Sequence, residues 1–221
     1  MDNALIIGAS GGIGAAMVAE LSARGVAVTG LSRSRDGLDI TQEASVSAAL
    51  GALRGPFDLI FNATGALHGA GHLPEKSLKS LTPDAMAAQF AVNCIGPALV
   101  LKHSTRLMPR NRRTVFAALS ARVGSIGDNA LGGWYSYRAS KAALNQIIHS
   151  GAVELARSHR HAICVALHPG TVATEFTADY AQRHQTVTPA QSVRNLLPVI
   201  ERLTPLETGG FFDWRGDVVP W

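Results

Sequence analysis

The chain opens with a short apolar run that leads directly into a glycine-rich turn, and this feature restricts the possible folds most. Residues 4–7 are followed by Gly8-Ala9-Ser10-Gly11-Gly12-Ile13-Gly14 and then by a helical pattern in which Ile13, Met17 and Leu21 recur every four residues. The glycines permit a tight turn and a close approach of the backbone to a ligand. Unpaired N–H groups at the start of the helix favour a phosphate there. The sequence therefore predicts a dinucleotide-binding strand–turn–helix unit.

Strand and helix patterns alternate along the rest of the chain. Strand patterns cover residues 26–31, 38–40, 57–61, 114–119, 162–167 and 210–212, and the longer helical patterns cover 43–54, 84–108, 137–159 and 189–203. The strands are nearly continuous apolar runs, as expected where helices cover both faces of a sheet. We therefore expect an α/β fold with one doubly wound parallel sheet of about seven strands and helices on both faces. No linker or repeat interrupts residues 1–221, so a single domain is expected.

Composition excludes several classes of protein. Apolar residues make up 47% of the 221 residues and charged residues 16%, which excludes a disordered chain. No apolar run approaches the roughly 18 residues of a membrane span, and the N-terminus lacks the layout of a signal peptide. The two cysteines, Cys94 and Cys164, form no disulfide framework. We expect a cytoplasmic protein with reduced thiols and no membrane partner.

The formal net charge of +4 includes one dense basic cluster. It consists of Arg106, Arg110, Arg112 and Arg113. The cluster falls at the expected end of the helix over 84–108, where cations complement the helix dipole. A nucleic-acid-binding surface usually combines a basic stripe with interleaved aromatic residues. We therefore favour a structural role for these arginines and expect no nucleic-acid partner.

Five further motifs follow the glycine turn in a fixed order. They are Leu38-Asp39-Ile40, Asn62-Ala63-Thr64-Gly65, Asn93 within Val92-Asn93-Cys94-Ile95-Gly96, Tyr137-Arg138-Ala139-Ser140-Lys141, and Pro169-Gly170-Thr171-Val172-Ala173-Thr174. With the Gly-x-x-x-Gly-x-Gly turn, this ordered set resembles the short-chain dehydrogenase/reductase family over roughly residues 4–176. The segment 124–145 and the run Phe211-Phe212-Asp213-Trp214 are similar to its C-factor-like, or C-signal-like, branch, which is related to small carbonyl reductases.

The resemblance implies a Rossmann fold and hydride transfer between a nicotinamide cofactor and a carbonyl or secondary alcohol. It implies catalytic roles for Asn93, Ser120, Tyr137 and Lys141. The implied cofactor contacts are Gly8, Ser10, Gly11, Gly12, Ile13, Gly14, Ser32, Arg33, Asp39, Ile40, Asn62, Ala63, Thr64, Gly65, Tyr137, Lys141, Pro169, Gly170, Val172 and Thr174. No metal is implied.

The chain departs from the family pattern at several positions. Ile7 replaces a threonine before the first glycine, and Ala63 and Thr64 replace the Asn-Ala of the Asn-Asn-Ala-Gly motif. The catalytic serine of the family is the residue whose position in this chain is hardest to assign. Its place at the end of the strand over 114–119 assigns it to Ser120, with Ser125 as the alternative, whereas a count back from Gly124 gives Ala121.

Tyr137 and Lys141 lie four residues apart, so a helix presents both side chains on one face. A nearby ammonium favours the phenolate, which predicts a lowered pKa for Tyr137 and a usable general acid or base. In family terms, Lys141 also binds the nicotinamide ribose, Ser120 hydrogen-bonds the substrate oxygen, and Asn93 positions a water.

The strand over 26–31 predicts which cofactor is bound. NAD-specific enzymes usually place a carboxylate after this strand for the ribose 2′-hydroxyl. This chain has Ser32 and Arg33 there and no acid before Asp36. A guanidinium can donate paired N–H groups to a 2′-phosphate. We therefore predict NADP(H) rather than NAD(H).

Other residues receive weaker assignments. His68 and His72 have helical metal-ligand spacing, but the glycines between them favour a loop and argue against a metal. Trp134 and Tyr135 either line the substrate site or pack an inserted loop. The stretch over 175–188 is the expected substrate loop, and its polar residues Glu175, Asp179, Arg183 and His184 are either ligands or plain surface.

Two wider expectations remain. The small residues from Ala139 to Ala143, with the helix over 84–108, resemble the four-helix interface common in this family, which implies a homodimer or homotetramer. The alternative to an enzyme is a cofactor-binding signalling or regulatory protein with little turnover, because the C-factor-like branch includes intercellular signals. An epimerase of the extended branch would need a substrate domain that the residues after Thr174 are too few to build.

Overall fold

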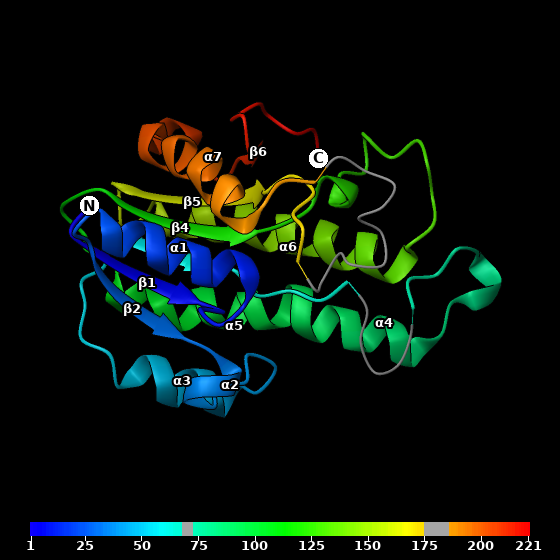
Figure 1. Ribbon diagram of the computed structural model, residues 1–221, viewed down its shortest axis with the longest axis horizontal. Helices are drawn as coiled ribbons and strands as arrows, with labels where there is room; N and C mark the ends of the chain where they lie inside the picture. Colours follow the sequence, from blue (N-terminus) through cyan, green and yellow to red (C-terminus); the bar gives the residue numbers. More distant parts are fainter. Residues whose placement is uncertain (68–72, 175–185) are drawn as a thin grey trace.

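The structure is a computed structural model that describes residues 1–67, 73–174 and 186–221. Its centre is a six-stranded sheet in the order β2-β1-β3-β4-β5-β6, with every neighbouring pair parallel (Figure 1). The strands are β1 (Asn3–Ile7), β2 (Ala27–Leu31), β3 (Leu59–Asn62), β4 (Thr114–Leu119), β5 (Ala162–His168) and β6 (Phe211–Asp213). Parallel pairing aligns the carboxyl ends of all these strands along one edge, where ligands of such sheets bind.

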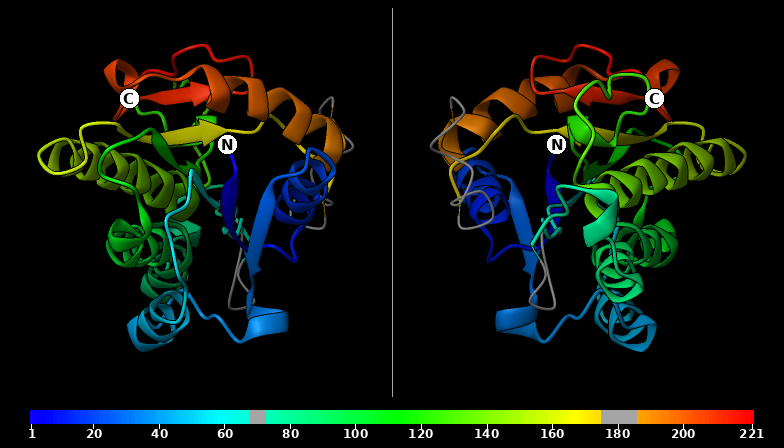
Figure 2. Two further views of the ribbon diagram at one scale, coloured as in Figure 1. Left: turned by 90° about the vertical axis from the view of Figure 1, so that its left-hand side faces the viewer. Right: turned by 90° about the vertical axis from the view of Figure 1, so that its right-hand side faces the viewer.

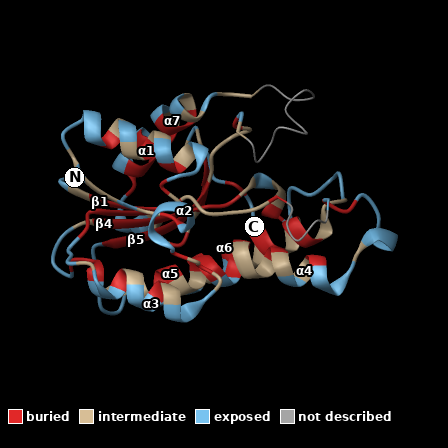
Figure 3. Cartoon of the chain, turned by 60° about the horizontal axis from the view of Figure 1, so that its bottom comes forward, coloured by how far each residue is buried: buried red, intermediate tan, exposed pale blue. Residues whose placement is uncertain are grey.

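Helices cover both faces of the sheet, so the molecule has three layers (Figure 2). One face carries α1 (Gly12–Ala23) and α7 (Pro189–Arg202), and the other carries α3 (Glu43–Gly51), α5 (Gly96–Ser104) and α6 (Tyr135–Leu155). Alternate strand residues serve the two layers: Ile6 packs toward α1 and α7, and Leu5 packs toward α3 and α5. The strands are accordingly buried throughout the centre (Figure 3). The expected α/β architecture is confirmed.

The helical pattern over 84–108 forms one continuous helical stretch. It comprises α4 (Pro83–Phe90), a π-helical turn η2 (Ala91–Ile95), α5 and the 3-10 turn η3 (Thr105–Leu107). By length and composition alone, the helix over 83–107 passes the test for a membrane span; in the fold it packs against α6. A π-turn inside a helix often marks a functional position, and this one contains Asn93.

The seventh strand, expected at residues 38–40, is not formed, and the described residues make six strands rather than about seven. A short helix α2 (Arg33–Asp36) ends at Gly37 in the left-handed conformation, and the Leu38 N–H then donates back to the Ser32 carbonyl at 3.2 Å. This local turn uses the backbone that a strand would need. The apolar residues of this segment indicate burial and not a strand, since Leu38 and Ile40 both lie in the core.

The basic cluster makes structural contacts at the ends of two helices. Arg106 donates to the carbonyl of Leu50 near the end of α3, and Arg113 donates to the carbonyl of Ile200 at 2.6 Å near the end of α7. Arg112 pairs with the buried carboxylate of Asp58. Guanidinium groups thus satisfy carbonyls that helix ends leave unpaired.

Candidate active site

The glycine turn joins β1 to α1 and is held by backbone hydrogen bonds. Gly8 has a φ of +85°, its N–H donates to the Leu31 carbonyl at 2.8 Å, and its carbonyl accepts from the Gly11 N–H at 3.0 Å. Helix α1 begins at Gly12 without a side-chain cap. The first N–H groups of a helix have no partner within the helix, so this turn presents donors for an anion.

Two of the turn's glycines leave no room for a side chain. A Cβ at Gly14 would lie 2.1 Å from the Gly8 carbonyl oxygen, and one at Gly12 would lie 2.7 Å from the Thr174 side chain. The second contact places residue 174 of the predicted Pro-Gly segment directly against the turn. Motifs 160 residues apart in the sequence therefore meet at one site.

The carboxyl edge of the sheet holds buried polar atoms that lack partners. Within the described ranges, three buried side-chain atoms are unpaired, and two of them, Asn62 Nδ2 and His168 Nδ1, end β3 and β5. Burial lowers the pKa of His168 to about 4, so its ring is neutral. Asn62 pairs in register with Ile7, directly before the glycine turn, so its unpaired amide nitrogen fits a site that a polar ligand completes. The residues present therefore fit a bound dinucleotide.

Tyr137 and Lys141 lie on the first two turns of α6, and both are buried. The Lys141 Nζ donates to the Leu119 carbonyl at 2.9 Å and lies 5.9 Å from the centre of the Tyr137 ring. Burial lowers the pKa of Lys141 to about 7 and raises the pKa of Tyr137 above its usual value. The expected lowering of the Tyr137 pKa is therefore wrong for the protein alone, because burial desolvates the phenol and so disfavours its charged form.

Asn93 links three parts of the chain. Its Oδ1 accepts from the Ala66 N–H at 2.9 Å, and its Nδ2 donates to the Ala66 carbonyl at 2.8 Å. Nδ2 also approaches Gln89 Oε1 at 2.7 Å and Ser140 Oγ at 3.3 Å. The Ser140 hydroxyl in turn donates to the Tyr137 carbonyl at 2.8 Å. Asn93 thus holds the loop after β3 against the helix that carries Tyr137.

Ser120 follows β4 and faces α6. Its hydroxyl donates to Asn145 Oδ1 at 2.6 Å, two helical turns along α6 from Tyr137. A role at the substrate oxygen requires this hydroxyl to exchange Asn145 for the substrate. The hydroxyl of the alternative, Ser125, accepts from the Asp128 N–H at 3.0 Å. Ala121 has no polar side chain. Ser120 and Ser125 both stay predictions.

Glu75 is a site residue that sequence reasoning missed. Helix α6 follows Trp134, whose φ is 51° and which supplies no side-chain cap. Instead, buried Glu75 accepts from the Ser136 N–H at 3.2 Å and from the Ser136 hydroxyl, while its carbonyl accepts from the Trp134 N–H at 2.5 Å. A carboxylate complements the positive end of a helix. A helix cap is normally predicted from the residues next to the helix in the sequence. Glu75 lies 61 residues from Ser136, so no local pattern indicated this cap.

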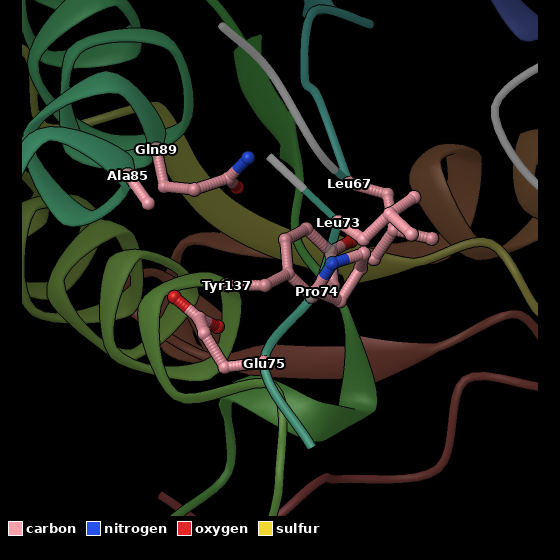
Figure 4. A pocket seen from close by; sticks show the side chains of 7 residues that line it. All are labelled: Leu67, Leu73, Pro74, Glu75, Ala85, Gln89 and Tyr137. Carbon is pink, nitrogen blue, oxygen red and sulfur yellow. The ribbon is translucent and has the colours of Figure 1, made fainter. Parts of the chain in front are cut away.

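A small pocket opens beside Tyr137 (Figure 4). Its described lining residues are Leu67, Leu73, Pro74, Glu75, Ala85, Gln89 and Tyr137. In Figure 4 the Glu75 side chain turns toward α6, whereas Gln89 extends from α4 toward the pocket. The Trp134 and Tyr137 rings meet edge to face, with centres 6.2 Å apart. Trp134 therefore packs against the Tyr137 ring at the entrance to α6.

The residues predicted for the adenosine end lie after β2. Ser32 is buried, and its hydroxyl caps α2 by accepting from the Arg35 N–H at 3.3 Å and also lies 3.2 Å from Asp36 Oδ2. Arg33 is exposed, and within the described part of the chain its guanidinium has no ion-pair partner. Asp39 binds Thr41 through both its N–H and its hydroxyl, which lowers the pKa of the Asp39 carboxyl. Arg33 is thus an exposed cation directly after β2 that a ligand can reach.

Several predictions fall outside the described residues. His68 and His72 belong to 68–72, and most of the expected substrate loop, with Glu175, Asp179, Arg183 and His184, belongs to 175–185. Among the residues that are described, no group of three or more His, Cys, Asp or Glu side chains could hold a metal.

Fold and site together define an α/β protein with a nucleotide-type glycine turn and a Tyr–Lys pair at one sheet edge. The family model for short chain dehydrogenases matches residues 2–185, and the chain belongs to that oxidoreductase family.

Three known proteins show the range of its relatives. The chain is 32% identical over 206 residues to the 1-hydroxy-2-glutathionyl-2-methyl-3-butene dehydrogenase of Rhodococcus sp. (strain AD45), covering 92% of this chain and 84% of that one. It is 37% identical over 139 residues to the C-signal of Myxococcus xanthus, covering 62% and 78%. A solved structure described as a short-chain dehydrogenase/reductase from Burkholderia multivorans with bound NADP has a TM-score of 0.81 and 26% identity, covering 100% of this chain and 99% of that one.

Proposed function

We propose that the protein is an NADP(H)-dependent oxidoreductase that transfers a hydride between nicotinamide and a carbonyl or secondary alcohol. The observation that carries this proposal is the pairing of buried Tyr137 with buried Lys141, 5.9 Å from ring centre to Nζ, at a pocket on the edge that holds the glycine turn. NADPH would supply the hydride; the residues Gly8–Gly14, Asn62, Lys141 and the segment 169–174 would hold it.

In the direction of reduction, the Tyr137 hydroxyl gives its proton to the carbonyl oxygen as the carbon receives the hydride, so an alcohol forms. The raised pKa of Tyr137 keeps the phenol protonated at neutral pH, so the proton is present on the hydroxyl before the reaction. Lys141 is held beside it by the Leu119 carbonyl, and Asn93 holds the helix turn through Ser140. Ser120 would support the developing oxyanion after releasing Asn145.

The preference for NADP(H) rests on Arg33. Its guanidinium is exposed at the end of β2 and has the donor geometry for a 2′-phosphate. The presence of NADP in the Burkholderia multivorans structure is consistent with this choice. The first carboxylate after β2 in the sequence, Asp36, accepts from the Ser32 N–H at 2.8 Å. The Asp36 carboxylate therefore accepts a hydrogen bond from the backbone of its own turn.

The test is oxidation of NADPH with a panel of small aldehydes and ketones, followed by nicotinamide absorbance, for the wild type and Tyr137→Phe. We expect the wild type to turn over at least one carbonyl and the variant to lose about a thousandfold in kcat while still binding NADPH. Undiminished turnover by Tyr137→Phe would contradict the assignment.

A second candidate is a nucleotide-binding signalling protein with little turnover. The specific observation in its favour is the 37% identity to the C-signal of Myxococcus xanthus. The same experiment separates the two candidates. If NADPH binds but the wild type and Tyr137→Phe are equally inert on every carbonyl, the signalling role is favoured.

We further propose that the protein is a cytoplasmic homo-oligomer that pairs through the outer faces of α5 and α6. Ile95, directly before α5, and Val153 of α6 are about half exposed, at 49% and 54%. Gly151 of α6 packs against Leu101 of α5, so the two helices form one continuous surface. Light scattering coupled to gel filtration tests this: a dimer or tetramer is expected, and Val153→Glu should shift it toward monomer.

A further inference from the structure

Gln89 is a buried polar side chain to which the proposed reaction assigns no role. It lies on α4, one helical turn before Asn93, and is only 5% exposed. It lines the same pocket as Tyr137, among the mainly apolar side chains Leu67, Pro74 and Ala85. A buried amide in apolar surroundings is costly unless its donors and acceptors are satisfied. The partners of this amide therefore indicate what the pocket accepts.

The hydrogen-bond network fixes which way the Gln89 amide faces. The Ala66 backbone N–H can only donate, so the Asn93 atom that it meets at 2.9 Å is the oxygen. The Asn93 nitrogen then points at Gln89 at 2.7 Å, and Gln89 must present its oxygen, Oε1, to it. Gln89 Nε2 is consequently turned away from Asn93.

The amide of Gln89 lies at the pocket. Figure 4 shows the side chain extending from α4 toward the pocket, with the amide group at its tip. In the part of the chain that the structure describes, no hydrogen bond reaches Nε2. Two N–H donors are therefore held in a fixed direction beside the proposed acid, in a pocket that is otherwise largely apolar.

We propose that Gln89 is a substrate-binding residue whose Nε2 donates to a second oxygen of the substrate. The inference rests on the proposed function, in which the first oxygen belongs to the carbonyl that Tyr137 protonates. The substrate class is then a carbonyl compound with an additional acceptor oxygen, such as a vicinal dicarbonyl, and not a simple ketone. Leu67, Pro74 and Ala85, which line the pocket, would face its carbon chain.

The test compares two probes with the same carbon chain, 2,3-hexanedione and 2-hexanone. Binding is measured by calorimetry on the protein saturated with NADP+, which provides no hydride, and turnover is measured separately with NADPH. Gln89→Met has a similar shape without the donors. We expect it to weaken dione binding and to lower kcat/KM for the dione about tenfold, with less than about a twofold change for 2-hexanone.

A second variant keeps the test valid if Gln89→Met fails to fold. Gln89→Glu keeps an oxygen for Asn93 but replaces the donor with an acceptor, and it should show the same loss for the dione. Gln146→Met, the same change at an exposed position of α6, serves as the control. Thermal melting and NADPH binding check that each variant is folded.

The outcomes separate the inference from the function on which it rests. Equal dione affinity in the wild type and both variants, or no dione binding by the wild type, overturns the inference. Failure of the wild type to oxidise NADPH with any carbonyl overturns the proposed function, while the binding comparison still decides the role of Gln89. Loss of dione binding in both variants, with 2-hexanone unaffected, supports it.

Discussion

The glycine turn and the first turn of α6 lie at the same sheet edge but are built in different ways. The turn is closed by backbone bonds among residues 8–11 and to the adjacent β2. The start of α6 is held by side chains distant in sequence: Glu75 satisfies Ser136, and Asn93 reaches Ser140. The glycine turn is thus formed by backbone hydrogen bonds, whereas the proposed acid–base site depends on polar side-chain contacts between residues distant in sequence. A side chain added at the glycine turn should exclude the nucleotide sterically. A substitution at the start of α6 should instead leave Tyr137 poorly positioned.

The largest effect should come from Gly14→Ala. The new Cβ would lie 2.1 Å from the Gly8 carbonyl oxygen, so the turn must deform. We expect NADPH to bind at least about a hundredfold more weakly, with a loss of about 2 kcal/mol in unfolding free energy. Calorimetric titration and urea unfolding measure the two effects. Gly51→Ala, where no atom lies within 4 Å of the added carbon, is the matched control. Normal NADPH binding by Gly14→Ala would show that the turn is not the nucleotide site.

Glu75→Ala tests the polar contacts that hold the start of α6. It removes the carboxylate that caps α6 and leaves Ser136 buried without its partner. We expect about a tenfold fall in kcat and a loss of about 1–2 kcal/mol in stability, with the Kd for NADPH changed less than about twofold.

The Glu75 experiment needs two controls. Glu75→Gln retains acceptor and shape and should recover part of kcat, while Glu154→Ala removes an exposed carboxylate from the same helix. If Glu75→Ala weakened NADPH binding as much as it slowed turnover, nucleotide binding at the glycine turn would depend on the start of α6, against the expectation.

Arg33→Ala should have a smaller effect that is confined to one cofactor. The exposed guanidinium is expected to contribute a charge-assisted contact to the 2′-phosphate. NADPH binding should weaken about tenfold, whereas NADH binding should change by less than about twofold. Dissociation constants for both cofactors, with exposed Arg54→Ala as the control, decide the point. Tighter binding of NADH than NADPH by the wild type would refute the NADP(H) assignment.

The subtlest effect is a pH dependence of stability that originates at Lys141. Burial lowers the pKa of Lys141 to about 7, whereas the unfolded chain keeps the ordinary lysine value of about 10.4. Between these values the unfolded state binds more protons, so the unfolding free energy rises with pH, by up to about 1.4 kcal/mol per pH unit. Below pH 7 both states are protonated and this contribution stops changing.

Urea unfolding of the nucleotide-free protein from pH 6 to 9 measures this contribution as a difference between variants. Lys141→Met should lose the rise with pH relative to the wild type, and Lys79→Met, at an exposed position, should keep it. Parallel curves for the wild type and Lys141→Met would mean that the Lys141 ammonium is not desolvated.

The sequence predicted the parts of the site that depend on local pattern. The glycine spacing predicted a turn that the structure forms with a positive φ at Gly8, and the four-residue spacing of Tyr137 and Lys141 put both on one helix. The apolar pattern was misleading at residues 38–40: Leu38 and Ile40 are buried as strand residues would be, but the backbone turns back on Ser32. The pKa of Tyr137 was predicted in the wrong direction because the extent of burial is not readable from spacing.

The sequence by itself determined the order of strands and helices, the phosphate-type turn and the identity of the paired phenol and amine, because each depends on residues within a few positions of one another. The tertiary structure alone decided that Glu75 caps α6, that Ser120 donates to Asn145, and that the Asn93 nitrogen donates to the Gln89 oxygen beside the pocket. These contacts join residues that are distant in sequence, or depend on a network that includes such residues. Their geometry exists only once the helices have packed on the sheet, so no local pattern encodes it.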